Sequence, residues 1–190
     1  PLLKSAMEQR VFINFDMESY ALKDLTREVF KRVISSKPYR TYRFFGIVLQ
    51  GYLRDSLKDA QDWVSFAKKR GTPFSIRLVK GAYWDAEIKR AQESGLDGYP
   101  VFTRKAHTDL SYLACARHLL QNTARVFPQF ATHNAATIAA VLHLADQAQV
   151  PPSAFEFQRL HGMGERIYQA VRDTDISNPA VRVYAPVGQH

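Results

Sequence analysis

Short apolar runs that end in polar residues alternate with helical patterns along the whole chain of 190 residues. Apolar runs of this length predict buried strands, whereas apolar residues spaced three or four apart predict helices that bury one face. Strands that alternate with helices form parallel sheets, because each helix carries the chain back along the sheet. The alternation therefore predicts a single α/β domain over residues 1–190.

Six strands are expected. They occupy residues 11–16, 44–50, 74–80, 129–132, 155–160 and 181–186. The helix after the first strand should bury one face at 3.6-residue spacing. That face consists of Leu22, Leu25, Val29, Phe30, Val33 and Ile34. The helix after the second strand should turn inward Leu57, Ala60, Trp63, Val64 and Ala67. Gly71 should end this helix, because glycine adopts a left-handed cap most easily.

The third unit contains an unusually long connection. A short helix is expected over residues 85–93, and a second helix begins only near Thr108. Residues 95–106 contain two glycines and a proline, which disfavour regular structure. Long irregular connections inside compact domains are often functional loops, so this segment is interpreted as one. Further along, Asn134 is expected to cap the helix after the fourth strand, and a short helix over residues 165–171 follows the fifth strand.

Residues suited to a functional site recur at or just past the predicted strand ends. They are Asp16, Gln50, Lys80, His133, Leu160 with His161, and Tyr184. In a barrel of parallel strands all carboxyl ends open at one mouth, so functional residues recur at every strand end. A doubly wound sheet instead concentrates them at one switch point, after a glycine-rich first turn. No G-x-G-x-x-G motif follows the first strand, so part of a closed barrel is favoured.

Charge narrows the classes of ligand only weakly. The formal net charge of +8 is compatible with phosphate-rich ligands, nucleic acid or an anionic membrane surface, but Lys and Arg are spread along the chain. The densest groups, residues 68–70 and Arg27 with Lys31 and Arg32, are interpreted as solvated helix faces. Strands with alternating basic and aromatic faces are not evident, so nucleic-acid binding through this segment is not expected.

Other sequence features bound the compartment and the chemistry. Cys115 is the single cysteine, which excludes an internal disulfide and fits a reducing compartment. Its place within a predicted helix is interpreted as a core position. No apolar run approaches the roughly 20 residues that cross a bilayer, and no secretory signal is visible, so a cytoplasmic location is expected. Motifs of zinc proteases, Walker A proteins and serine hydrolases are missing, and the six His residues lack metal-ligand spacing. No metal is expected.

Arg77 and Lys80 lie near the end of the third strand. An ideal strand would place them on opposite faces, but Gly81 can bend the chain at the rim. A cation in a parallel strand is costly unless it is paired or bound to a ligand. Arg77 is therefore expected to contact a ligand or to pair with a carboxylate such as Asp16. Lys80 leaves a second enzyme class open, because a partly buried amine can form a Schiff base with a carbonyl substrate.

Three further groups suit a flat or phosphorylated ligand, although each has a structural alternative. Tyr83 and Trp84 can stack on a conjugated ring or anchor their loop. His133 and Asn134 open a helix, where exposed amides and the helix dipole favour phosphate, but a histidine there can also be purely structural. Residues 103–105 add a hydroxyl and two cations in the long connection, or form a solvated turn.

Seven blocks of sequence resemble, in order, the proline dehydrogenase domain of bacterial proline utilization A flavoenzymes. The blocks are INFDME (13–18), GIVLQGY (46–52), RLVKGAYWD (77–85), YPVFTRK (99–105), FATHN (130–134), FEFQRLHGMG (155–164) and YAPVG (184–188). The resemblance implies a distorted (β/α)8 TIM barrel that holds FAD at its mouth, with these six strands as its third to eighth. The first two strands, one with a pocket lysine, would be missing. So would the final helix, whose paired arginines and glutamate grip proline.

The resemblance also implies roles for individual residues. Arg77 would approach the flavin N5 edge and Gln50 the pyrimidine edge. The other cofactor-binding residues would be Val79, Lys80, Gly81, Ala82, Trp84, Phe102, Thr103, Arg104, Lys105, Ala131, Thr132, His133, Asn134 and Gln158. The proline pocket would be shaped by Asp16, Tyr83, Leu160 and Tyr184, with Arg77, Asp16 and Tyr83 as the catalytic residues.

The activity implied by the resemblance is FAD-dependent oxidation of L-proline to Δ1-pyrroline-5-carboxylate, with hydride transfer to flavin N5 and electrons passed to a quinone. It also implies peripheral association with the inner membrane and fusion or coupling to an aldehyde dehydrogenase module. Two alternatives remain open from the residues. One is a Schiff-base barrel enzyme that uses Lys80, and the other is a truncated chain that does not catalyse a reaction.

Overall fold

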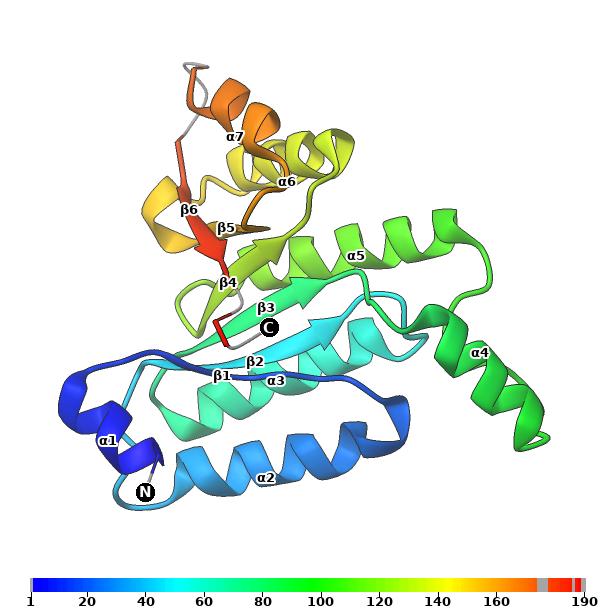
Figure 1. The fold of residues 1–190 in the computed structure, drawn as a ribbon. Coiled ribbons are helices and arrows are strands. Elements are labelled where there is room, and N and C mark those ends of the chain that lie inside the picture. Colours follow the sequence, from blue (N-terminus) through cyan, green and yellow to red (C-terminus); the bar gives the residue numbers. More distant parts are fainter. Residues whose placement is uncertain (1, 174–177, 186, 189–190) are drawn as a thin grey trace.

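The computed structural model describes residues 2–173, 178–185 and 187–188 (Figure 1). Within these residues one sheet contains six parallel strands whose spatial order is their order in the chain. The strands are β1 (Ile13–Phe15), β2 (Phe45–Gln50), β3 (Phe74–Val79), β4 (Val126–Ala131), β5 (Glu156–Leu160) and β6 (Ala180–Tyr184). A doubly wound sheet reverses its strand order at a switch point, so this order excludes that alternative.

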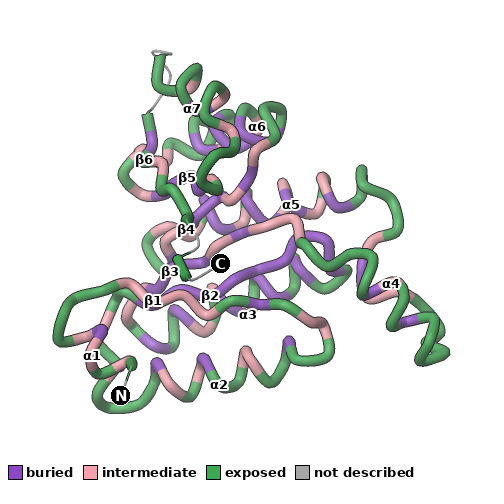
Figure 2. The backbone as a smooth tube through the Cα atoms, viewed as in Figure 1, coloured by how far each residue is buried: buried purple, intermediate pink, exposed green. Residues whose placement is uncertain are grey.

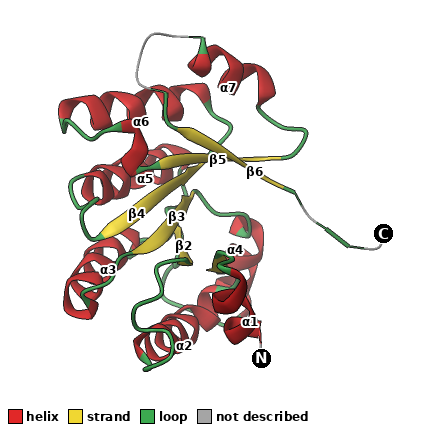
Figure 3. Ribbon diagram, turned by 90° about the vertical axis from the view of Figure 1, so that its left-hand side faces the viewer, coloured by secondary structure: helices red, strands yellow, loops and turns green. Residues whose placement is uncertain are grey.

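Helices connect the strands and cover the outer face of the sheet (Figure 3). The helices are α1 (Leu2–Gln9), α2 (Lys23–Ser35), α3 (Ser56–Arg70), α4 (Trp84–Glu93), α5 (Lys105–Leu120), α6 (Ala135–Gln147) and α7 (Glu165–Arg172), with short 3-10 turns η1 (Tyr20–Leu22) and η2 (Pro152–Ala154). Figure 1 shows α1 near the amino ends of the strands and α4 beyond their carboxyl ends.

The sheet curls into a half-barrel. The guanidinium carbon of Arg182 on β6 lies 5.8 Å from the ring centroid of Phe12, which precedes β1 at the other edge of the sheet. Likewise, the guanidinium carbon of Arg77 on β3 lies 5.4 Å from the ring centroid of Tyr184 on β6. Side chains from distant strands meet in this way because twisted parallel strands close toward a barrel. The prediction of an α/β fold with part of a parallel barrel is confirmed.

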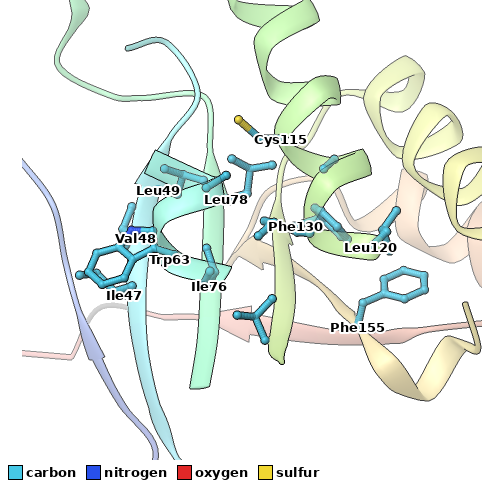
Figure 4. Close-up of a cluster of buried hydrophobic side chains, with 14 of the residues drawn as sticks. Ile47, Val48, Leu49, Trp63, Ile76, Leu78, Cys115, Leu120, Phe130 and Phe155 are labelled. Carbon is cyan, nitrogen blue, oxygen red and sulfur yellow. The ribbon is translucent and has the colours of Figure 1, made fainter. Parts of the chain in front are cut away.

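Alternate residues of each strand point to opposite faces of the sheet. On the outer face, Ile47, Leu49, Ile76 and Leu78 pack against the helices, and Trp63 of α3 is buried with them (Figure 4). Figure 2 shows this as a band of buried residues along the strands, with exposed residues on the outer sides of the helices. The residues between them in sequence face the concave side, where the candidate site lies.

Several local predictions are confirmed. Gly71 ends α3 in the left-handed conformation with φ 76°. The Asn134 side chain caps α6 by accepting a hydrogen bond from the backbone N–H of Thr137 at 2.9 Å. Cys115 is buried in α5. The connection between α4 and α5 is irregular, apart from an isolated bridge between Val101 and Leu53.

Some boundaries differ from the prediction. Helix α1 is not anticipated from the sequence pattern. Strand β4 begins at Val126 rather than Gln129, because Pro128 is accommodated within the strand although proline has no N–H for the ladder. The sixth strand is observed only as far as Tyr184, and the predicted end at Pro186 lies outside the described residues.

The predicted buried face of α2 is only partly correct. Phe30 and Ile34 are buried, but Leu22, Leu25 and Val29 are exposed, with 61% of Leu25 accessible to solvent. Strand β1 is an edge of the described sheet, so α2 has a neighbouring helix on one side only.

Leu57 of α3 is also exposed rather than inward-facing. The buried stripe of α3 is turned toward Asp59, which pairs with Lys23 and Arg27 of α2.

Two basic side chains that were expected to be solvated are buried or nearly so. Arg27 pairs with Asp59 and Asp62 of α3. Arg70 is only 7% exposed and donates hydrogen bonds to the backbone carbonyls of Ile34, Tyr39, Tyr42, Thr72 and Pro73. Burial lowers the pKa of Arg70 to about 10. The long side chain supplies hydrogen-bond donors to backbone carbonyls in the loops that enter β2 and β3.

Replacing Arg70 tests this role. Arg70→Met should lower the free energy of unfolding by about 3 kcal/mol, because buried carbonyls lose their donors. The matched change Lys69→Met, at an exposed neighbouring position, should alter it by less than about 0.5 kcal/mol. Urea unfolding of both variants provides the measurement, and equal effects would contradict the assigned role.

Candidate functional site

A cavity of about 760 Å³ lies on the concave side of the sheet, at the carboxyl ends of the strands. Its volume is in the range of small-molecule and cofactor sites, which is roughly 300–1,000 Å³. Most of the predicted site residues line it. They are Asp16, Gln50, Arg77, Val79, Lys80, Gly81, Ala82, Tyr83, Lys105, Ala131, Thr132, His133, Asn134, Gln158, Leu160 and Tyr184.

The strand pleat brings these side chains together. In the β2–β3 pair, Val48 lies opposite Arg77 and Gln50 opposite Val79, and all four line the cavity. Residues two apart on a strand point to the same face of the sheet. Because paired residues of neighbouring strands lie side by side, their side chains point to that face together. Inward positions of β2–β6, together with the loop that directly follows β1, therefore contribute to one site.

Four predicted cofactor-binding residues do not line this cavity: Trp84, Phe102, Thr103 and Arg104. His161, which was selected for its position just past a strand end, does not line it either. Trp84 is partly exposed at the start of α4 and donates from its indole Nε1 to the carbonyl of Phe102 at 2.8 Å. This contact ties the long connection to α4. A cofactor contact for these residues stays a prediction.

Four residues of the cavity wall were not predicted: Met17, Glu18, Val48 and Arg159. Val48 could have been found from the two-residue period that includes Gln50. Met17 and Glu18 directly follow Asp16 in the same loop. The sequence carries no comparable signal for Arg159, which lies at the end of β5 and donates to the carbonyls of Leu160 and Met163.

Arg77 and Asp16 form an ion pair in the cavity. Nη1 of Arg77 lies 2.8 Å from Oδ1 of Asp16, which also accepts a hydrogen bond from Asn14 at 3.0 Å. The Tyr184 ring lies beside the same guanidinium. Nε of Arg77 is buried without a hydrogen-bond partner in the described structure. Of the two sequence interpretations of Arg77, pairing with Asp16 is observed, and the buried Nε–H remains as a donor for a ligand.

Gln50 fixes the loop that follows β1. Its Nε2 donates to the backbone carbonyls of Met17 and Glu18, both at 3.1 Å. The residue is only 2% exposed, and its Oε1 has no partner within the described part of the chain. An unpaired buried acceptor is costly, so this oxygen is a strong candidate for a contact with a bound group.

Lys80 and Lys105 share one carboxylate. Nζ of Lys80 lies 2.5 Å from Oδ1 of Asp109, and Nζ of Lys105 lies 2.6 Å from Oδ2. Hydrogen bonds from Lys105 and then Lys80 lower the pKa of Asp109. The two cations line the cavity close together, which is an arrangement suited to an anionic group.

The residues that lead into α6 form another part of the cavity wall. Nε2 of His133 accepts a hydrogen bond from the backbone N–H of Leu160 at 3.0 Å, so its Nδ1 is left to carry the proton. The hydroxyl of Thr132 accepts from the backbone N–H of Asn134 at 3.2 Å. His133 thus links β4 to β5, and only its other ring nitrogen is available as a donor to a ligand.

Below the cavity, Glu156 is buried on the concave face of β5 and is 4% exposed. Its Oε1 accepts hydrogen bonds from Gln129 on β4, from Gln158 on β5 and from Arg182 on β6. Arg182 donates a second bond to Oε2 at 3.0 Å. Hydrogen bonding to Glu156 raises the pKa of Arg182. The pair crosses the β5–β6 ladder and neutralises two charges on this face.

The described residues contain neither a candidate metal site nor a candidate membrane span. No group of three or more His, Cys, Asp or Glu side chains is arranged to hold a metal ion there. In the same residues, no helix has the length and apolar character needed to span a membrane.

Comparison with known proteins decides the family. The family model for proline dehydrogenase matches residues 1–190. The chain belongs to the proline dehydrogenase family.

Members of the proline dehydrogenase family resemble the chain closely. The bifunctional protein PutA of Salmonella typhimurium is 43% identical over 198 residues, which cover 100% of this chain and 15% of that protein. Proline dehydrogenase 1 of Bacillus subtilis is 28% identical over 98% of the chain and 53% of its own length. The crystal structure of PutA from Bdellovibrio bacteriovorus matches with a TM-score of 0.94 and 46% identity, over 100% of this chain and 19% of that one. The chain thus spans only a small part of its PutA relatives.

A glycine lets the backbone of the cavity wall approach a neighbouring ring. Gly81 has φ 131°, and a Cβ there would lie 2.5 Å from the Tyr52 ring. That ring is buried with Leu53 and Val101, and burial, with a smaller effect of Glu87, raises the pKa of Tyr52 to about 12. The ring has no room to yield, so the course of the wall from Lys80 to Ala82 depends on this glycine.

Gly81→Ala should lower the free energy of unfolding by about 2–3 kcal/mol, because the added methyl overlaps the Tyr52 ring in a backbone conformation that already disfavours side chains. Gly95→Ala is the matched control. Gly95 also has a positive φ, 59°, but a Cβ there meets nothing within 4 Å, so only about 1 kcal/mol of backbone strain is expected. Thermal unfolding should separate the variants, and equal losses would exclude the steric explanation.

Proposed function

We propose that this chain forms most of an FAD-binding proline dehydrogenase site, and that the protein containing it oxidises L-proline to Δ1-pyrroline-5-carboxylate. The observation that carries the proposal is the convergence of Gln50, Arg77 and Tyr184 from β2, β3 and β6 on one cavity, in a member of the proline dehydrogenase family. A barrel mouth is where such enzymes assemble their sites.

Two orphaned buried atoms fit the ring of a flavin. Oε1 of Gln50 is an acceptor and Nε of Arg77 is a donor, and neither has a partner in the described structure. The pyrimidine portion of a flavin offers both an N–H donor and adjacent acceptors. When bound, FAD would supply the hydride acceptor at N5. The chain's part is to hold that ring by Gln50 and Arg77 in a fixed orientation.

The phosphate portion of FAD has its own matching wall. Lys80 and Lys105 provide two cations, and the start of α6 provides backbone N–H groups and the positive end of a helix dipole. Nδ1–H of His133 and the side-chain nitrogen Nδ2 of Asn134 add donors beside them. These groups would bind the pyrophosphate and keep the ring at the other end of the cavity.

The proline pocket would lie between the Asp16–Arg77 pair and Tyr184, with Tyr83 and Leu160 completing its wall. The Arg77 cation disfavours a second positive charge nearby, so it favours the unprotonated proline amine that hydride loss requires. The aromatic ring of Tyr184 and the Leu160 side chain exclude water from the reacting carbon. The substrate carboxylate would be bound by paired arginines on a further helix of the complete barrel.

In this proposal β1–β6 are the third to eighth strands of a distorted (β/α)8 barrel. The two edges of the described sheet would then meet the first two strands in the complete protein. A quinone would receive the electrons, an aldehyde dehydrogenase module would be fused or coupled, and the protein would be cytoplasmic with peripheral contact to the inner membrane. The name of the bifunctional PutA relatives is consistent with a second enzymatic module.

The Schiff-base alternative has less support. An amine must present a free lone pair to add to a carbonyl carbon. Nζ of Lys80 instead donates to Asp109 at 2.5 Å and lies 6.0 Å from the Tyr112 ring centroid. Lys80 is thus engaged by Asp109 and is not directed at a ligand.

The decisive experiment compares this chain with an extended protein. We define the extended protein as residues 1–190 flanked by the segments that precede and follow the matching region in the B. bacteriovorus relative. The extended protein should be yellow, retain FAD through gel filtration and reduce a dye when proline is added. The chain alone should bind FAD more weakly. An extended protein that holds FAD but does not oxidise proline would overturn the proposal, and borohydride trapping of a carbonyl substrate on Lys80 would support the alternative.

Arg77→Met in the extended protein should lower the flavin reduction potential by about 30 mV or more, which corresponds to about 1.4 kcal/mol for a two-electron couple. The reason is that a cation beside the ring stabilises the extra negative charge of the reduced form. The KM for proline should change less than the potential does. Arg77→Lys keeps the charge and should retain most of the potential, as spectroelectrochemical titration would determine. An unchanged potential in Arg77→Met would refute the assignment.

A further inference from the structure

Glu156 determines which way the Gln158 carboxamide points. An ionised carboxylate only accepts hydrogen bonds, so the nitrogen of each amide that contacts it must face it. Nε2 of Gln158 lies 2.9 Å from Oε1 of Glu156. The other end of the amide, Oε1, accepts no hydrogen bond from the described residues, and Gln158 lines the cavity. Glu156 uses one N–H of Nε2, and Oε1 is left as the free acceptor of the amide.

Arg182 keeps the carboxylate in place. It donates to both oxygens of Glu156, at 2.7 and 3.0 Å, and it lies opposite Gln158 in the β5–β6 register. A two-point contact of this kind restricts rotation of the carboxylate more than a single bond does. Because Glu156 is buried, the pair and the amides that surround it form a closed network on the concave face.

We propose that Glu156 is a positioning residue that presents Gln158 to the cavity as a hydrogen-bond acceptor. This inference rests on the proposed FAD site and narrows it. Phosphate oxygens only accept hydrogen bonds at neutral pH, so Oε1 of Gln158 faces an O–H or N–H group of the cofactor and not a pyrophosphate oxygen. The ribityl and ribose hydroxyls and the ring or adenine N–H groups have the required chemistry.

Gln129 provides a matched control. Its Nε2 donates to the same Oε1 of Glu156 at 2.8 Å, and it lies opposite Glu156 in the β4–β5 register. It is buried but does not line the cavity, and its own Oε1 has no partner in the described structure. Removing this amide perturbs the network without touching a ligand.

The test uses the extended protein. Glu156→Gln introduces a donor next to Gln158 and removes one acceptor from Arg182, so the Gln158 amide is no longer held in one orientation. The dissociation constant for FAD should rise about tenfold, the loss of roughly one hydrogen bond. Gln129→Leu should leave it within about twofold of the starting value. Flavin fluorescence titration measures both, with thermal unfolding as the check on folding.

Three outcomes would overturn the role of Glu156. They are unchanged FAD affinity in Glu156→Gln, an equal loss in Gln129→Leu, and a cofactor-bound structure in which Oε1 of Gln158 accepts no hydrogen bond from the ligand. If Glu156→Gln does not fold, Gln158→Met keeps a similar side-chain volume and removes the carboxamide with its acceptor, and unaltered affinity in that variant also rejects the proposal. Failure of the unsubstituted extended protein to bind FAD would instead reject the proposed function.

Discussion

The two-residue period of the parallel strands is the constraint on which the rest of the structure depends. It places Ile47, Leu49, Ile76 and Leu78 against the helices, and it places the residues between them on the concave side. Burial of the first set stabilises the sheet, and the curl of the sheet gathers the second set at one mouth. Stability and the candidate site thus come from alternate residues of the same strands.

Placing functional residues on the concave side puts charged side chains in a partly enclosed space. The chain neutralises these charges in pairs. Asp16 pairs with Arg77, and Glu156 pairs with Arg182. Buried charges left alone would be strongly destabilising, whereas paired charges with further hydrogen bonds are tolerated. Two of the buried atoms that remain unpaired, Oε1 of Gln50 and Nε of Arg77, belong to residues that line the cavity, where the proposed flavin would supply the missing partners.

The sequence was sufficient for the order of elements and for most of the cavity wall. Apolar runs and strand-end residues such as Lys80 and His133 carry their signal locally, and the family resemblance added the inward residues of the strands. Whether a given charged side chain is buried or solvated was harder to predict from the sequence. Arg70 looks like part of a solvated run, but it is buried because carbonyls from the end of α2 and from the loop after it, both distant in sequence, converge on it. The exposure of Leu25 depends on which helix lies beside α2, which no local pattern reveals.

The two outer strands of the half-barrel have a practical consequence. In the described sheet β1 pairs only with β2, and β6 pairs only with β5, so each has one side with free backbone N–H and C=O groups. Such free edges are templates for pairing with other chains. A preparation of these residues without flanking segments therefore has two sheet edges that can pair with other molecules. Its lifetime as a monomer in solution falls as protein concentration rises.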